Sequence, residues 1–256
     1  GEQMSERGVG NGVSLIIFAG IVVGMPTALI QSTALFQTGE LTIFVILLVG
    51  ATMLAVIGVV IFVETAVRKI PIQYARRQQG NRVFGGQFTH LPLKINSANV
   101  IPPIFASSIL MFPATITGFA SVEWLNRLGN SLSPGRMLYN VLFLLLILFF
   151  CFLYTAIQYN PNKIAEEIKR SGGFIPGIRP GNKTAKYLYN VLNRLTFGGA
   201  VYLSAVCILP TLLITYFKVP FSFGGTSLLI LVGVAIDTNT QIETFLLNQN
   251  YDGFIR

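Results

Sequence analysis

The sequence predicts an all-α membrane protein that crosses the bilayer several times. Three observations lead to this fold class. Hydrophobic residues make up 52% of the 256 residues and charged residues only 11%, whereas soluble domains carry roughly 25% charged residues. Apolar runs of the length that spans a bilayer, about 20 residues, recur along the chain. The basic residues gather in alternate loops between these runs.

Six apolar segments are predicted to span the membrane. Their approximate bounds are 12–30, 41–63, 98–119, 137–158, 197–217 and 220–236. Pro102 and Pro103 lie near the start of the third segment, where each removes a backbone donor and stiffens or kinks a helix. After the sixth segment the chain continues as the polar TNTQIETFLLNQ. This continuation indicates a helix that leaves the membrane.

The connecting loops differ sharply in charge. The two long loops, at about 64–97 and 159–196, contain 13 basic residues, and the loops of opposite parity contain 3. Because cytoplasmic loops of membrane proteins carry an excess of Lys and Arg, this asymmetry predicts that both long loops and both chain ends are cytoplasmic. Such charge indicates either a solvated face that contacts lipid headgroups or a docking platform for a cytosolic partner.

Both long loops are predicted to have a structure of their own, which favours the docking platform. The first loop contains the turn YARRQQGNR followed by the alternating VFGGQFTH, a pattern typical of a small hairpin. In the second loop, Asn160 can cap a short helix and Pro161 can occupy its first turn. Gly172 and Gly173 are predicted to end that helix, and the proline-braced FIPGIRPG follows.

The stretch that enters the third segment is too polar for an ordinary membrane anchor. Lipid cannot satisfy the hydrogen-bonding groups of its Asn and Ser side chains. These polar residues are Asn96, Ser97, Asn99, Ser107 and Ser108. Two interpretations remain open: a helix buried in a bundle with its polar groups paired to neighbours, or a helix that lines a cavity and moves.

Few residues could serve catalysis or bind a metal. The lone His90 cannot build a metal site, and Cys151 and Cys207 lie in apolar runs without a disulfide pattern. We therefore expect no enzyme, no cofactor and no metal. Glu64 and Asp237 are interpreted as solvated helix ends or as partners of a basic loop. The chain begins GEQMSERG, without an initiator Met, so we expect a fragment from the middle of a longer protein.

Three motifs resemble the SecY family, the channel subunits of the Sec protein-translocation complex. They are YARRQQGNRVFGGQFTHLPLKINSANVIPPIFASS, SGGFIPGIRPGNKTAKYL and VPFSFGGTSLLI, in the family's order and at its distances. The likeness covers essentially all 256 residues. It implies helices five to ten of a ten-helix clamshell channel. Residues 1–35 would be the last helix of the N-terminal half and 36–256 the C-terminal half, with a hinge at about Gln31 to Glu40.

The resemblance also implies three groups of site residues. A lateral gate would be lined by the third segment, with a bend at its prolines: Asn96, Ser97, Asn99, Pro102, Pro103, Ser107 and Ser108. An apolar ring would seal the pore: Ile17, Ile104, Ile230 and, as a weaker candidate, Phe112. A basic surface would dock a motor or a ribosome: Arg179, Arg76, Arg77, Arg82, Lys169, Arg170 and Lys183.

These implications describe a passive channel in the bacterial cytoplasmic (inner) membrane. It would move unfolded polypeptides across the membrane and release transmembrane segments laterally into it. The implied partners are SecE, SecG, the SecA motor ATPase, the ribosome, signal peptides, unfolded preproteins, anionic phospholipids and the missing N-terminal half of the same protein. The alternative is a secondary transporter with a broken helix at its binding site, although no carboxylate or basic pair lies mid-membrane to bind a coupling ion.

Overall fold

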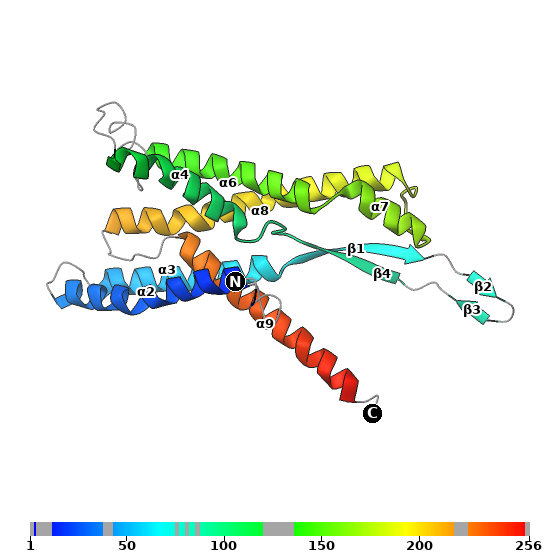
Figure 1. The fold of residues 1–256 in the computed structure, drawn as a ribbon, viewed down its shortest axis with the longest axis horizontal. Coiled ribbons are helices and arrows are strands. Elements are labelled where there is room, and N and C mark those ends of the chain that lie inside the picture. Colours follow the sequence, from blue (N-terminus) through cyan, green and yellow to red (C-terminus); the bar gives the residue numbers. More distant parts are fainter. Residues whose placement is uncertain are drawn as a thin grey trace. The chain divides into compact units, whose positions relative to one another are not determined.

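Helices make up most of the computed structural model, which describes residues 3, 12–37, 43–74, 77–79, 82–84, 88–119, 136–217 and 225–253. The helices are α2 (Gly12–Gln37), α3 (Ile43–Thr65), α4 (Ile101–Phe119), α6 (Met137–Gln158), α7 (Pro161–Arg170), α8 (Asn182–Phe217) and α9 (Gly225–Gly253) (Figure 1). The strands are β1 (Val67–Tyr74), β2 (Arg77–Gln79), β3 (Arg82–Phe84), β4 (Phe88–Lys94) and β5 (Gly173–Phe174).

The chain forms two compact units. The first unit comprises Gly1–Phe62, Ser107–Leu142 and Ser204–Arg256. The second unit comprises Val63–Ala106 and Phe143–Leu203. The sequence predicted a boundary near residue 35 between the two halves of a longer protein. The two compact units do not test that boundary, which stays a prediction.

Each of the six predicted spans overlaps a helix in the described residues. Among the described residues, three helical runs are long and apolar enough to cross a membrane: Ile43–Thr65, Met137–Arg170 and Asn182–Thr211. Two shorter apolar helices cover Ser14–Thr27 and Ile101–Pro113. The prediction of a helical membrane protein is therefore confirmed, while the number of spans stays a prediction.

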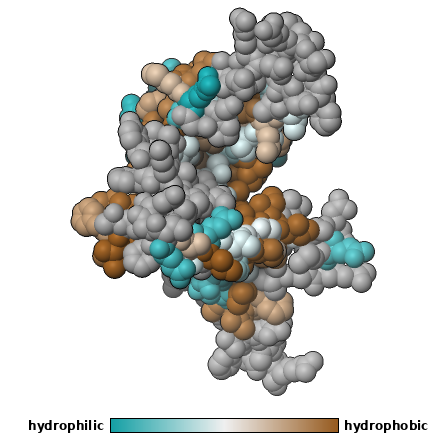
Figure 2. All heavy atoms as spheres, turned by 90° about the vertical axis from the view of Figure 1, so that its left-hand side faces the viewer, coloured by the Kyte–Doolittle hydropathy of each residue, from teal (hydrophilic) through white to brown (hydrophobic). Residues whose placement is uncertain are grey.

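The first unit is built from apolar helices. Within it α2 packs against α9. Gly225, the first residue of α9, lies directly on the backbone of α8, since a Cβ added there would lie 2.6 Å from the Cα of Cys207. Many large side chains face outward, such as Phe44, Leu54 and Phe62 in α3, which are 69%, 71% and 75% exposed. Hydrophobic side chains are correspondingly visible on the surface (Figure 2).

The second unit contains a three-stranded antiparallel sheet in the order β4–β1–β5. Residues Val67 to Gln73 of β1 pair with Lys94 to Phe88 of β4, so the predicted hairpin is confirmed and is longer than expected. A second hairpin pairs β2 with β3. The sequence did not indicate β5, which joins the two long loops by pairing Gln73 with Phe174.

The helix α7 is capped as predicted. The side chain of Asn160 accepts hydrogen bonds from the backbone N–H groups of Asn162 and Lys163, and Pro161 occupies the first turn. Gly172 follows the helix with φ of +73°, a conformation that glycine adopts without strain. Gly173 then lies in the sheet, where an added Cβ would approach Ile72 to 3.0 Å.

The fifth span was predicted to begin at about residue 197, whereas the helix that contains it, α8, already begins at Asn182. The stretch before residue 197 was interpreted as loop because of its charges. Its apolar residues recur at helical spacing, however, and Leu188, Val191 and Leu192 are buried. They form one core with Ile70 and other residues of the sheet and α7. The polar half of α8 is thus part of a folded domain.

The helix α2 also continues further than expected. It contains Pro26 and ends at Gln37. The predicted hinge at about Gln31 to Glu40 therefore begins in the last turns of α2, and residues 38–42 lie outside the described part of the chain.

Candidate functional site

The predicted gate helix is entered through a buried polar cluster in the second unit. Asn96 is 2% exposed, and its side-chain amide donates to the carboxyl oxygen Oε1 of Glu64 at 2.7 Å. The same amide donates to the backbone carbonyl of Asn99 at 3.1 Å. Glu64 is 9% exposed, so its interpretation as a solvated helix end is wrong. We call Glu64, Asn96 and Asn99 the junction cluster.

The backbone of the junction cluster is tightly turned. Asn99 has φ of +52°, in the left-handed region that Asn tolerates better than most residues. The hydroxyl of Ser97 donates to the carbonyl of Lys94 at 3.0 Å, and the N–H of Ile95 donates to the carbonyl of Ala66 at 3.1 Å. The polar side chains before α4 therefore fix the path of the chain from β4 into the helix.

Helix α8 lies against the same cluster. A Cβ at Gly199 would lie 3.0 Å from the carbonyl oxygen of Ile95 and 3.6 Å from the Cα of Asn96. Its neighbour Gly198 has open space at the corresponding position. Only a residue without a side chain permits this approach. Neither the burial of Glu64 nor the role of Gly199 was indicated by the sequence, because both depend on contacts between distant segments.

The two prolines of the predicted gate occupy the first turn of α4. Pro102 and Pro103 are both among the most buried side chains, and α4 begins at Ile101. In a first turn, proline removes no intrahelical hydrogen bond. Prolines at these positions do not by themselves force a bend, so the bend predicted at this pair stays a prediction. The proline inside the helix is Pro113.

The remaining gate and ring residues are distributed over both units. Ser107 is half-buried and Ser108 is exposed. Ile104 belongs to the second unit. The other ring residues belong to the first unit: Ile17 is half-buried, Ile230 is buried and Phe112 is exposed. Whether these residues form a gate and a ring stays a prediction.

The loop that carries Arg179 is braced, as predicted. The hydroxyl of the buried Thr184 donates to the carbonyl of Arg179 at 3.0 Å. Gly177 and Gly181 have φ of +82° and +106°, and Ile175 anchors the loop in the core of the second unit. The side chain of Arg179 is exposed. A fixed backbone with an exposed guanidinium loses little conformational entropy when it docks.

The other basic candidates lie on several different elements of the second unit. Lys169, Arg170 and Lys183 are exposed. Arg170 forms an ion pair with Glu166 at 3.0 Å, in which both side chains are largely exposed. Arg77 lies in β2 and Arg82 in β3, and Arg76 lies outside the described residues. Asp237, in α9, is half-buried.

Comparison with known proteins identifies the family. The SecY family model matches residues 1–239. The protein translocase subunit SecY of Escherichia coli (strain K12) is 48% identical over 260 residues, covering 100% of this chain and 59% of the relative. The corresponding subunit of Pseudomonas aeruginosa (strain ATCC 15692) is 49% identical with the same coverage. The chain thus spans about three fifths of the length of these curated relatives.

A solved structure shares the fold. The structure described as "The structure of a protein conducting channel" superposes with a TM-score of 0.58 at 18% sequence identity. The superposition covers 94% of this chain and 60% of that chain. At this identity the likeness concerns the fold alone. Together with the match over residues 1–239, these comparisons show that the chain belongs to the SecY family.

Proposed function

We propose that the protein that carries this chain is the channel subunit of a protein translocase. It passes unfolded polypeptides across the bacterial cytoplasmic membrane and releases transmembrane segments laterally into the lipid. The observation that carries this proposal is the family match over residues 1–239. The apolar runs that can cross a membrane support it, since three of them occur in the described residues.

The lateral gate is assigned to α4. Asn96 and Ser97 hold the entrance of the helix, and Ser107 and Ser108 lie further along it. A helix fixed at one end by the junction cluster can exchange neighbours along the rest of its length. The ring that closes the pore is assigned to Ile17, Ile104 and Ile230, because aliphatic constrictions exclude water and ions.

The part of the second unit that the two long loops form, at about 64–97 and 159–196, is assigned to the cytoplasmic side, as its excess of basic residues indicates. Its exposed basic residues, with Arg179 at the braced loop, dock the SecA motor or the ribosome. SecE and SecG are the companion subunits. Signal peptides and unfolded preproteins are the substrates, and anionic phospholipids surround the basic face. The protein catalyses no reaction itself and receives its energy from the docked partner.

The experiment that tests this function uses the protein that carries this chain, reconstituted with SecE and SecG in vesicles. SecA, ATP and a radiolabelled preprotein are added outside, and the amount of protease-protected preprotein is measured. We expect protected preprotein to accumulate only when ATP is present. The rival function, a secondary transporter, predicts uptake of a small solute driven by an ion gradient instead. Such uptake without protected preprotein would overturn the proposal.

A further inference from the structure

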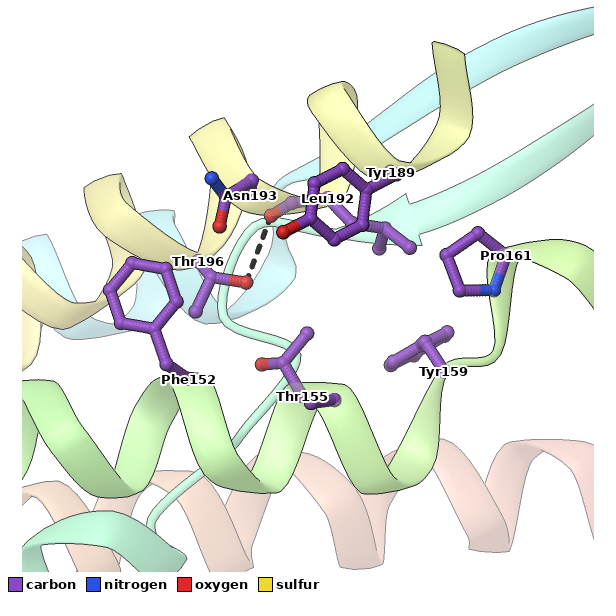
Figure 3. A pocket seen from close by; sticks show the side chains of 9 residues that line it. Phe152, Thr155, Tyr159, Pro161, Tyr189, Leu192, Asn193 and Thr196 are labelled. Carbon is purple, nitrogen blue, oxygen red and sulfur yellow. Dashed lines mark hydrogen bonds between the residues drawn. The ribbon is translucent and has the colours of Figure 1, made fainter. Parts of the chain in front are cut away.

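A pocket in the second unit has no role in the proposed function. It has a volume of about 360 Å³ and lies between the end of α6 and the first half of α8 (Figure 3). Its size falls in the range of ligand sites, about 300–1,000 Å³. Phe152, Thr155 and Tyr159 line it from the α6 side, and Leu192 and Thr196 line it from α8.

The pocket continues into a second one, whose lining includes a basic side chain. A neighbouring pocket of about 460 Å³ shares Pro161 and Tyr189 with the first and is also lined by Asn162, Asn182 and Lys186. Together the two form a groove that is apolar at one end and cationic at the other. Helix α8 contains no Asp or Glu. Helix α7, which begins beside the second pocket, contains two acidic and three basic residues, so the basic residues of the two helices outnumber the acidic ones. The groove therefore suits a ligand with an apolar tail and an anionic head.

The hydroxyl of Thr155, which is unpaired among the described residues, indicates that such a ligand has a hydrogen-bond acceptor. Within the described part of the chain, this hydroxyl is buried and has no hydrogen-bond partner. The residue is 7% exposed. Across the pocket, Thr196 donates to the carbonyl of Leu192 at 2.8 Å (Figure 3), the usual arrangement of Thr in a helix. Because Thr155 lacks this bond, an oxygen of a bound molecule can accept from it.

The groove lies where the apolar part of α6 ends. Gln158 is the last residue of α6, and the polar α7 begins at Pro161. Tyr159 and Tyr189 flank this point, and tyrosines are enriched at the level of the lipid headgroups. A phospholipid presents its chemical groups in the matching order at this level. Its acyl chain comes first, then the ester carbonyl oxygens, then the phosphate.

We propose that this groove binds one anionic phospholipid. An acyl chain lies beside Phe152 and Leu192, an ester carbonyl accepts a hydrogen bond from Thr155, and the phosphate lies beside Lys186. The bound lipid ties the end of α6 to the polar half of α8. A lipid held in this way differs from the annular lipids of the bilayer, because its binding depends on individual side chains and on the charge of its headgroup.

The experiment uses the complete complex in phosphatidylcholine vesicles that contain a trace of phosphatidylglycerol with a photoreactive diazirine in its acyl chain. After illumination, cross-linked peptides are quantified by mass spectrometry. We expect the peptides around Thr155 and Leu192 to carry the strongest labelling. Unlabelled phosphatidylglycerol competes, and additional phosphatidylcholine does not. The readout does not depend on protein export, so its failure is distinct from failure of the proposed function.

Two variants and two matched controls make the test specific. Lys186→Gln and Thr155→Val each lower labelling of the groove about fivefold, the effect of one headgroup charge or one hydrogen bond. Lys69→Gln removes an exposed charge of β1 outside the groove, and Thr52→Val removes a hydroxyl bonded to its own helix at 2.6 Å. Both controls leave labelling unchanged.

Three results would each overturn the proposal. The first is labelling spread evenly over the apolar surface. The second is labelling of the groove to the same level in Lys186→Gln and Thr155→Val as in the unchanged protein. The third is a groove covered by a companion subunit, in which case the cross-links fall on that subunit. Thermal unfolding of each variant is measured in parallel. If a variant misfolds, it is replaced by Ala156→Phe, whose larger side chain fills the pocket. Ala156→Phe must also abolish labelling of the groove.

Discussion

Two helices of the molecule, α3 and α8, bury their most apolar stretches to very different degrees. In the most apolar stretch of α3, 17% of the residues are buried, whereas 50% are buried in that of the run Asn182–Thr211. The core of the second unit is closed by residues of the sheet, α7 and α8 themselves. Most of the surface of α3 instead requires lipid or other helices. This closed core shows that the long loops of this chain form a folded domain and are not connectors.

The largest expected effect follows from replacing a core residue of the second unit. Leu188 is 1% exposed, so Leu188→Ala leaves a cavity and lowers the free energy of unfolding by about 2–5 kcal/mol. In α3, Leu54 is 71% exposed, and Leu54→Ala is expected to cost less than about 1 kcal/mol. Urea titration of the purified protein in detergent measures both. Equal losses would mean that the outer face of α3 is packed, which would break the comparison.

The next effect distinguishes two adjacent glycines of α8. Gly199→Ala brings a methyl group against the carbonyl oxygen of Ile95, where the added Cβ has 3.0 Å. Because backbone cannot move aside easily, we expect a loss of about 1–3 kcal/mol. Gly198→Ala meets nothing within 4 Å and is expected to stabilise the helix by about 0.5–1 kcal/mol. The unfolding temperatures of the two variants should therefore shift in opposite directions. A shift of both temperatures in the same direction would contradict the packing of α8 at this point.

The junction cluster is expected to have an intermediate effect. Glu64→Ala removes one of the two acceptors of the buried Asn96 amide and is expected to cost about 1–3 kcal/mol. Glu64→Gln keeps an acceptor and should cost less. A double-mutant cycle with Asn96→Ala measures the coupling directly, which we expect to be at least about 0.5 kcal/mol. Independent, additive effects of the two changes would show that the hydrogen bond does not join α3 to the start of α4.

The smallest effect is expected on the surface of α7. The ion pair between Arg170 and Glu166 joins side chains that are 78% and 61% exposed. Water and salt screen such pairs, so we expect a coupling of about 0.3–0.5 kcal/mol that declines as salt is added. The corresponding double-mutant cycle is run at low and at high ionic strength. A coupling as large as that of the junction cluster would remove the distinction between the buried and the exposed polar contacts.

The sequence was sufficient to predict local structure. Apolar runs of about 20 residues placed the long helices. Asn160 and Pro161 marked the start of α7, and the glycines and prolines around Arg179 predicted the braced loop. These features depend on residues close together in the chain. A hairpin was predicted in the first loop for the same reason, because its turn residues and the alternating residues after them are close together in the chain.

Contacts between distant segments could not be predicted in this way. Pairing of β5 with β1, burial of Glu64 against Asn96, and the approach of α8 at Gly199 all join residues far apart in sequence. A single charged residue at the end of an apolar run gives the same signal whether it faces water or a buried amide. For this reason Glu64 was interpreted as a solvated helix end or as a partner of a basic loop, and its contact with a buried amide was missed. The polar half of α8 was missed because its exposed charges obscured its apolar stripe.

The most direct test of the central claim, that the second unit docks the partner that drives transport, is export by Arg179→Glu. The exposed guanidinium is replaced by a carboxylate, while the backbone braces from Thr184 and the two glycines stay in place. The variant is reconstituted with SecE and SecG, and protease-protected preprotein is measured with SecA and ATP. We predict normal insertion and assembly with export abolished, and partial export in Arg179→Lys, since a point charge cannot replace a bidentate fork. Export by Arg179→Glu at the level of the unchanged protein would contradict the account.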